Sequence, residues 1–213
     1  MPAPYVHSRL LASDRRNSED RVEVFERNDA SVVVVADGAG GVRGGALASK
    51  ALVETARAVT RNASLDVHDT ALWTVLLKEV DATLAAKMAG ETTGVVVIIG
   101  SKGLMGVSAG DSEAWIVTAT SVDDLTMGQK KARLGSGRAL PISFHRPGFD
   151  GVLVVGTDGL FRYATAERIV EALRGGDVER AAERLAALAR LPSGGLQDDM
   201  GVVVIRSRYT PTR

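Results

Sequence analysis

The 213-residue sequence predicts an α+β fold in which two antiparallel β-sheets pack on each other with helices outside. Runs of apolar, largely β-branched residues at 31–36 and 201–205 indicate strands that are buried on both faces. Several of these runs are joined by only a few residues. Since a parallel crossover needs a dozen or more residues, neighbouring strands must be antiparallel. Antiparallel sheets that are buried on both faces require a layered arrangement.

The N-terminal half is predicted to begin with an antiparallel hairpin. Its strands are 21–26 and 31–36, and residues 27–29 form the turn. Two helices are expected next, at about 44–61 and 69–88. In the second helix, apolar residues recur at three- and four-residue steps, which marks one buried face.

A meander of short strands is expected after these helices, at 93–99, 104–108 and 113–118. Glycine-containing turns separate the three strands. The following segment, 119–150, contains several glycines and two prolines and is predicted to be irregular.

The C-terminal part is predicted to contain a strand, two helices and a final strand. The strand at 152–156 re-enters the core. The two helices are capped near Thr165 and Asp177, because a short polar side chain precedes each apolar periodic run. The last strand ends near Arg206. The chain length suits one domain of moderate size.

The composition argues against several classes of function. The 26 basic and 26 acidic residues balance, whereas a nucleic-acid binder needs a basic surplus. The absence of cysteine excludes disulfides, a thiol nucleophile and a zinc–thiolate site. No apolar run approaches the ~20 residues of a membrane helix, and residues 1–7 lack a signal-peptide pattern. We therefore expect a cytoplasmic protein without nucleic-acid or membrane partners.

Acidic residues stand where the predicted strands end. Asp37 and Asp158 directly follow apolar runs, and Asp198 and Asp199 precede the last one. A carboxylate at the mouth of a buried strand is costly to leave uncompensated. Each of these residues, taken alone, is also explained by an ordinary turn. Taken together they favour a site for a hard metal ion with oxygen ligands.

Four segments, taken in order, resemble the metal-dependent protein phosphatase family of type 2C, in a short bacterial form. The segments are RRNSEDR (15–21), DGAGG (37–41), GDSEA (110–114), and TDGLF (157–161) followed by QDDM (197–200). Each segment alone is a weak signal, but their order and their spacing around apolar strands are specific. The resemblance covers about residues 15–206.

The resemblance implies a four-layer αββα sandwich, which agrees with the layers inferred from the strands. It implies a single phosphatase 2C-like domain over 1–213, with a short flap region at about 119–150. It also implies two Mn²⁺ or Mg²⁺ ions in the cleft between the sheets, and a weaker third ion beside them. Carboxylates suit such hard cations.

The motif match also implies roles for individual residues. Asp37 would bridge both ions, and the carbonyl of Gly38 would ligate one of them. Glu19 would serve the second ion, directly or through water. Asp158 and Asp198 would serve the first ion. Strand alternation sends Asp198 and Asp199 to opposite faces, so only one of the two is expected to be a primary ligand.

Two further roles follow from the same match. Asp111 would, with Asp158, bind the third ion, and Arg15 would bind the substrate phosphate. An arginine fork can contact two phosphate oxygens and offset charge in the transition state. Paired divalent ions can activate a water molecule for attack on phosphorus.

The function that the resemblance implies is a serine/threonine phosphoprotein phosphatase that depends on manganese or magnesium. It would hydrolyse phosphomonoesters by attack of a metal-activated water molecule. Its partners would be phosphoserine or phosphothreonine proteins, among them a cognate Ser/Thr kinase or the substrates of that kinase. No covalent enzyme intermediate is expected, because the chain has no cysteine and no Ser/His pair is apparent.

The sequence also departs from the family pattern. Family members often carry a histidine after the Asp-Gly pair, whereas Ala39 and Val42 hold those places here. The displaced Asn17 weakens the register of the first motif. These departures and the short flap leave a catalytically weak or inactive binding module open as the alternative. A small phosphorylated metabolite stays open as a substrate.

Some residues outside the motifs carry their own expectations. The stretch 134–141 is either a compact replacement for the flap, with Arg133 and Arg138 facing an anionic substrate, or a plain surface loop. All three histidines lie far from the motifs in the sequence and are expected at the surface. The two tryptophans are expected in the core.

Overall fold

The computed structural model of the chain describes residues 5–14, 18–39, 44–174 and 177–207. Within these residues, one five-stranded sheet contains β1 (Tyr5–Ala12), β10 (Met200–Ser207), β9 (Val152–Gly156), β6 (Glu113–Val117) and β7 (Val122–Asp124), in that order. The other five-stranded sheet contains β2 (Arg21–Glu26), β3 (Ala30–Ala36), β4 (Gly94–Gly100), β5 (Gly103–Ala109) and β8 (Ile142–Arg146). All paired neighbours are antiparallel, which confirms the predicted strand directions.

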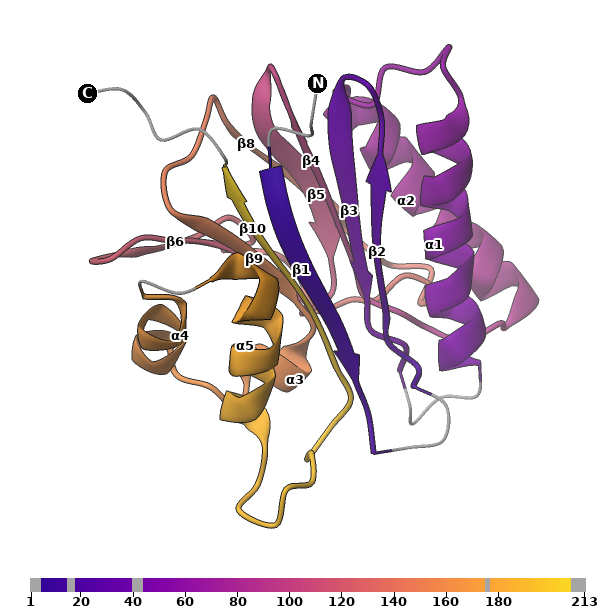
Figure 1. Ribbon diagram of the computed structural model, residues 1–213. Helices are drawn as coiled ribbons and strands as arrows, with labels where there is room; N and C mark the ends of the chain where they lie inside the picture. Colours follow the sequence, from indigo (N-terminus) through magenta and orange to yellow (C-terminus); the bar gives the residue numbers. More distant parts are fainter. Residues whose placement is uncertain (1–4, 15–17, 40–43, 175–176, 208–213) are drawn as a thin grey trace.

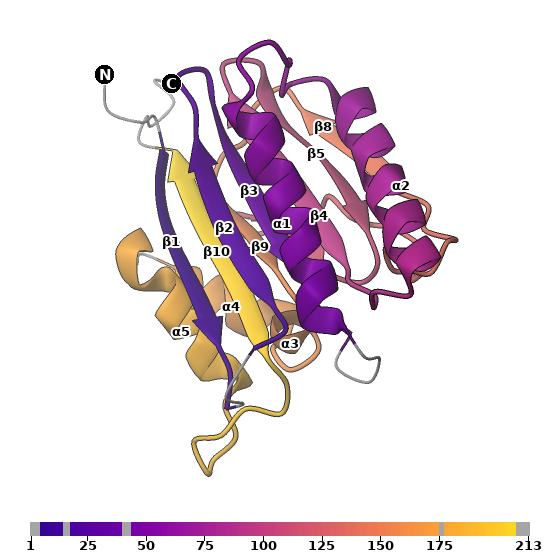
Figure 2. The ribbon, with the colours of Figure 1, turned by 90° about the vertical axis from the view of Figure 1, so that its right-hand side faces the viewer.

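Helices cover the outer face of each sheet (Figures 1 and 2). The long helices α1 (Gly45–Arg61) and α2 (Thr70–Lys87) lie on the sheet that contains β3. The shorter helices α3 (Asp158–Phe161), α4 (Ala166–Leu173) and α5 (Ala181–Ala189) lie on the sheet that contains β10. The two sheets and their helices form the αββα layers that the sequence predicts.

The predicted helix caps are confirmed. The Thr165 hydroxyl accepts a hydrogen bond from the Arg168 N–H at the start of α4. The Asp177 carboxylate accepts one from the Glu179 N–H, ahead of a 3₁₀ turn at Val178–Arg180 that leads into α5. Both side chains satisfy a backbone donor that has no partner inside its helix.

Strand β3 explains why a wholly apolar run forms an antiparallel strand. Val33 and Val35 lie in the apolar cluster between the two sheets. Val32 and Val34 lie in the cluster under α1 and α2. Successive side chains of a strand point to opposite faces, so both faces of β3 are buried.

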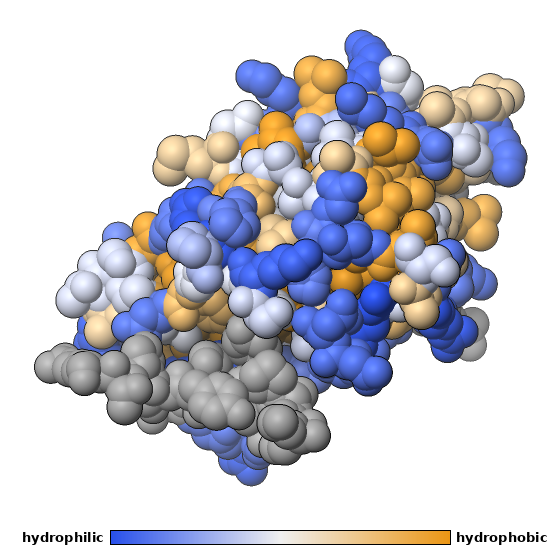
Figure 3. Space-filling view, turned by 90° about the horizontal axis from the view of Figure 1, so that it is seen from above, coloured by the Kyte–Doolittle hydropathy of each residue, from blue (hydrophilic) through white to orange (hydrophobic). Residues whose placement is uncertain are grey.

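A third apolar cluster lies under α3, α4 and α5. On the face seen in Figure 3, hydrophobic and hydrophilic residues are intermixed.

The structure also contains elements that the sequence did not predict. Strand β1 pairs with β10 along its whole length, although polar residues interrupt its apolar pattern. The single-turn helix α3 directly follows β9. Segment 119–150, which was predicted to be irregular, contains β7 and β8. These two strands pair with β6 and β5, respectively.

Expectations for the aromatic and histidine residues are partly confirmed. Trp73 is buried in the core, while Trp115 is half-buried and packs on Phe161 with ring centroids 4.5 Å apart. His7 and His145 are exposed. The prediction for His68 was wrong, because its side chain is only 4% exposed.

A buried carboxylate on α2 holds the loop formed by residues 133–139. Asp81 is 6% exposed. Its Oδ1 accepts hydrogen bonds from the Gly135 and Gly137 N–H groups, at 2.7 and 2.9 Å, and its Oδ2 accepts one from Ala139 N–H at 3.1 Å. A carboxylate bonded to three backbone donors fixes the conformation of this 133–139 loop.

Replacing Asp81 with alanine is expected to lower the free energy of unfolding by about 3 kcal/mol, because it leaves three backbone donors, one of them buried and two partly buried, without partners. Urea denaturation followed by circular dichroism measures the change. Glu79→Ala, at an exposed position of the same helix, is the matched control and is expected to stay within about 0.5 kcal/mol of the parent protein. Equal stability of the two variants would contradict the assigned role of Asp81.

Among the described residues, no helix combines the length and the apolar character needed to cross a membrane.

Candidate metal centre

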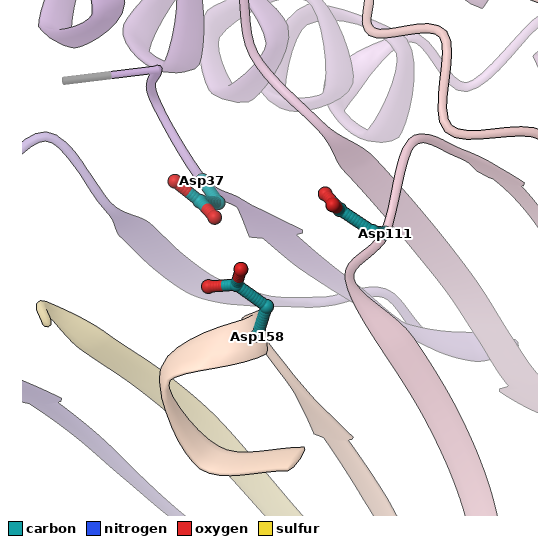
Figure 4. Close-up of side chains that lie close together, drawn as sticks. All are labelled: Asp37, Asp111 and Asp158. Carbon is teal, nitrogen blue, oxygen red and sulfur yellow. The ribbon is translucent and has the colours of Figure 1, made fainter. Parts of the chain in front are cut away.

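Three of the predicted carboxylates converge between the two sheets. One oxygen atom from each of Asp37, Asp111 and Asp158 lies within 4.8 Å of the others, and Figure 4 shows the three side chains facing one another. Asp37 follows β3, Asp111 lies in the turn between β5 and β6, and Asp158 opens α3 directly after β9. The sandwich thus brings together strand ends that are far apart in the sequence.

The backbone of Asp37 is held by two buried threonines. The Asp37 N–H donates to Thr93 Oγ1 at 3.0 Å, and the Asp37 carbonyl accepts from Thr93 N–H at 2.8 Å and from Thr92 Oγ1 at 2.9 Å. The Thr93 hydroxyl also bonds to the Ser112 hydroxyl, next to Asp111. These contacts fix the position of Asp37 relative to the turn that carries Asp111.

Gly38 allows three backbone segments to meet beside Asp37. A Cβ atom on Gly38 would lie 2.5 Å from the Gly45 carbonyl oxygen and 2.7 Å from the Glu19 carbonyl oxygen. Both distances are far shorter than a van der Waals contact, so a side chain cannot be accommodated here. The predicted role of the Gly38 carbonyl as a metal ligand stays a prediction.

The structure adds a carboxylate that the sequence analysis missed. Asp20 is 2% exposed, and its Oδ2 accepts a hydrogen bond from Thr157 Oγ1 at 2.8 Å. The hairpin register contains the signal that would have located it. Arg21 pairs with Ala36, so the next position along the hairpin places Asp20 opposite Asp37.

Glu19, which was predicted as a ligand, is only partly buried. Its backbone N–H donates to Asp199 Oδ2 at 3.2 Å, and its carbonyl accepts from Ser49 Oγ at 2.6 Å. A ligand role for the Glu19 carboxylate stays a prediction. Asp20 is the buried carboxylate of this segment.

The adjacent residues Asp198 and Asp199 have different surroundings. Asp199 is 6% exposed, and it accepts hydrogen bonds from the Ser13 hydroxyl and from the Glu19 N–H. Asp198 is more exposed and accepts a hydrogen bond from the Asp199 N–H at 3.0 Å. Asp199 thus joins the N-terminal segment to β10. The predicted ligand role of Asp198 stays a prediction.

The electrostatics of the cluster favour a bound cation. Burial, together with the charges of Asp20 and Asp158, raises the pKa of Asp37 to about 9. Burial also raises the pKa of Asp20 to about 7, with a further contribution from Asp199. Burial raises the pKa of Asp158, although Arg162 pairs with it at 2.7 Å and opposes the shift. Crowded carboxylates of this kind are stabilised in their charged form by a nearby positive charge.

An atom without a partner indicates where such a cation fits. Within the described residues, Asp111 Oδ1 is buried and makes no hydrogen bond. Buried polar atoms normally have a partner. Oxygen ligands from several carboxylates suit Mg²⁺ or Mn²⁺. The residues present therefore fit a divalent ion.

We expect the metal-free protein to lose stability as the pH rises from about 5 to about 8. The folded-state pKa values of Asp37 and Asp20 lie above the usual 3.8, so the folded protein binds more protons than the unfolded chain over this range. Urea denaturation in EDTA at several pH values measures the slope. The variant Asp37→Asn is expected to flatten it. A midpoint that is constant or rises with pH in the parent protein would contradict this prediction.

Parts of the first two predicted motifs lie outside the described residues. These are residues 15–17, among them Arg15, the predicted phosphate-binding residue, and residues 40–41. Val42, one of the places where family members often carry a histidine, also lies outside them.

No family model matches the chain, and no curated protein matches it. Solved structures do match. A bacterial serine phosphatase aligns over 97% of this chain and 99% of its own, with 19% identity and a TM-score of 0.83. Serine/threonine phosphatase Stp1 from Staphylococcus aureus aligns over 95% of both chains, with 18% identity and a TM-score of 0.81.

The catalytic domain of serine/threonine protein phosphatase PstP, in complex with two manganese ions, aligns over 94% of this chain and 97% of its own. The identity is 19% and the TM-score is 0.73. TM-scores of 0.73 to 0.83, with such coverage, establish a common fold even though the sequence identities are below 20%. The chain thus has the fold of the bacterial serine/threonine phosphatases of type 2C, as its four sequence segments predict.

Proposed function

We propose that this protein is a metal-dependent phosphatase that hydrolyses phosphoserine and phosphothreonine monoesters in proteins. The observation that carries the proposal is the convergence of Asp37, Asp111 and Asp158, with Asp20 beside them, between the two sheets. The same fold belongs to serine/threonine phosphatases, one of which holds two manganese ions. We propose two Mn²⁺ or Mg²⁺ ions for this chain and a weaker third.

The proposed ligands come from both sheets. Asp37 is proposed to reach both principal ions. The other proposed ligands of the principal ions are the carbonyl of Gly38 and the carboxylates of Asp158 and Asp198, together with either Asp20 or Glu19. Asp111 is proposed as a ligand of the weaker ion. The direct support is strongest for Asp37, Asp111 and Asp158, because their oxygen atoms lie within 4.8 Å of one another.

The bound ions would supply activation of water and neutralisation of the phosphate charge. The protein's own residues provide the geometry. Thr92 and Thr93 hold the backbone of Asp37, and Thr157 orients Asp20. Arg15 is proposed to bind the phosphate. Because the chain has no cysteine, a thiol nucleophile cannot take part.

The substrates that we propose are phosphoserine and phosphothreonine proteins, among them a cognate Ser/Thr kinase or its own substrates. Residues 1–213 are proposed to act as a single phosphatase domain in the cytoplasm. No described feature favours the alternative of an inactive binding module.

Purified protein with Mn²⁺ is expected to release phosphate from phosphoserine and phosphothreonine peptides, and EDTA is expected to abolish the release. We expect a higher kcat/KM for these peptides than for small phosphorylated metabolites. Phosphate release from both substrate classes, compared under the same conditions, is the measurement. Binding of Mn²⁺ in calorimetry without turnover of any substrate would instead support the binding module.

A further inference from the structure

The 133–139 loop carries an arginine beside the carboxylate cluster. Arg133 Nη2 lies 4.0 Å from Asp111 Oδ2, which is too long for a hydrogen bond. Among the described residues, Arg133 Nε is buried and has no hydrogen-bond partner. The side chain as a whole is 35% exposed, so a ligand from solvent can reach it. Arg133 therefore has a side chain that solvent partly reaches, a buried Nε without a partner, and an Nη2 that is too far from Asp111 for a hydrogen bond.

The backbone that carries Arg133 is tied to the backbone of Asp37. Its neighbour Leu134 is fully buried and exchanges two hydrogen bonds with Thr92, at 2.8 and 2.9 Å. The Thr92 hydroxyl in turn donates to the Asp37 carbonyl. On the other side, Asp81 holds the loop through three backbone N–H groups. The base of the Arg133 side chain is therefore fixed relative to the cluster.

The charge of the guanidinium acts on the cluster at short range. Burial dominates the raised pKa of Asp37, but the charge of Arg133 opposes that shift. Another described arginine beside the cluster, Arg162, is engaged differently. It forms a 2.7 Å ion pair with Asp158, and its side chain is 55% exposed. Arg133 is more available to a ligand than Arg162, because its Nη2 lies 4.0 Å from the nearest carboxylate oxygen of Asp111, too far for a hydrogen bond.

We propose that Arg133 is a substrate-binding residue whose guanidinium contacts the phosphoryl group of a phosphomonoester in the carboxylate cluster. The proposal rests on the proposed function. A planar guanidinium can donate two parallel hydrogen bonds to a phosphate, and fixing its base reduces the entropy that is lost on binding. Arg133 would thus supply part of the positive charge that a dianion needs in an acidic site.

The test compares Arg133→Met and Arg133→Lys with Arg138→Met. Arg138 lies in the same loop but is exposed, so its loss controls for a change of net charge. Inorganic phosphate binding to the Mn²⁺-loaded proteins is measured by calorimetry, and KM and kcat are measured with a phosphopeptide. Mn²⁺ affinity is measured separately in each variant.

Arg133→Met is expected to weaken phosphate binding and to raise KM by roughly tenfold, as expected for a lost hydrogen bond between charged groups. The change in kcat is expected to be smaller. The phosphate affinity and the KM of Arg133→Lys are expected to lie between those of the parent and those of Arg133→Met, because lysine keeps the positive charge but cannot donate two parallel hydrogen bonds. Arg138→Met is expected to match the parent protein.

Two results would overturn the proposal. One is an Arg133→Met protein with unchanged phosphate affinity, and tighter Mn²⁺ binding in that protein would mean that Arg133 only offsets the charge of Asp111. The other is a loss of phosphate affinity in Arg138→Met that equals the loss in Arg133→Met. Phosphate binding does not require turnover, so the calorimetry tests Arg133 even if the protein hydrolyses no substrate. If Arg133→Met does not fold, a parent-like phosphate affinity in Arg133→Lys also overturns the proposal.

Discussion

Replacing Asp37 with asparagine is expected to lower Mn²⁺-dependent turnover of a phosphopeptide by more than about 100-fold. Loss of a mere outer-shell partner of a metal ligand already costs about 10- to 100-fold, and Asp37 is itself a proposed ligand. Asp37 is the carboxylate that the other acidic groups surround, and its proposed role is to reach both ions. Steady-state kinetics at saturating Mn²⁺ measure the loss. Calorimetry is expected to show weaker Mn²⁺ binding in the same variant.

The same variant is expected to be more stable than the parent protein when both are free of metal at pH 8. Asparagine removes a buried group that is costly to ionise and that neighbouring carboxylates repel. Urea denaturation in EDTA measures this change. Asp150→Asn, at an exposed position before β9, is the control. It is expected to change neither the Mn²⁺-dependent turnover nor the stability of the metal-free protein. Full activity of Asp37→Asn would reject the proposed metal centre.

Replacing Gly159 with alanine is expected to destabilise the protein by about 3 kcal/mol or more, the upper range for overpacking of a well-packed site. Gly159 lies in helix α3, where alanine would ordinarily be preferred to glycine by about 1 kcal/mol. Here a Cβ atom would lie 2.0 Å from the Asp199 carbonyl oxygen. Relief of this clash must separate Asp158 from the start of β10, so Mn²⁺ affinity is expected to fall as well.

Gly148→Ala is the matched control for this prediction. Gly148 is exposed, and a Cβ atom there would have no neighbour within 4 Å. Its stability is expected to stay within about 0.5 kcal/mol of the parent protein. Urea denaturation of both variants, with and without Mn²⁺, gives the comparison. A Gly159→Ala protein as stable as Gly148→Ala would show that the close approach of α3 to Asp199 has no energetic consequence.

Strand β3 illustrates why most of the fold could be predicted from the sequence. Its residues are apolar on both faces, and the short turn before it requires an antiparallel neighbour. Strand β1 shows the limit of this reasoning. Its sequence, YVHSRLLA, contains polar residues, and it becomes a strand because β10 offers a complete antiparallel partner. That partner lies almost 200 positions away in the chain.

The candidate site likewise contains residues that the sequence could identify and a residue that it did not. Asp37 and Asp158 could be identified because each directly follows an apolar strand, a position that is visible in the local sequence. The motif match did not separate Asp20 from Glu19, because both precede the same strand, and only the hairpin register places Asp20 opposite Asp37. The hydrogen bond from Thr157, 137 positions away, distinguishes Asp20 as the buried carboxylate.

The layered α+β architecture and the carboxylates at the strand ends could be predicted without coordinates, because hydrophobic periodicity and turn length are local properties of the chain. Three features emerged only when the chain was folded: which acidic groups meet, that Asp81 holds the 133–139 loop, and that Arg133 lies beside Asp111. These contacts join segments that are distant in the sequence. Their geometry depends on strand register and on the packing of one layer against another, and no local pattern encodes either of these.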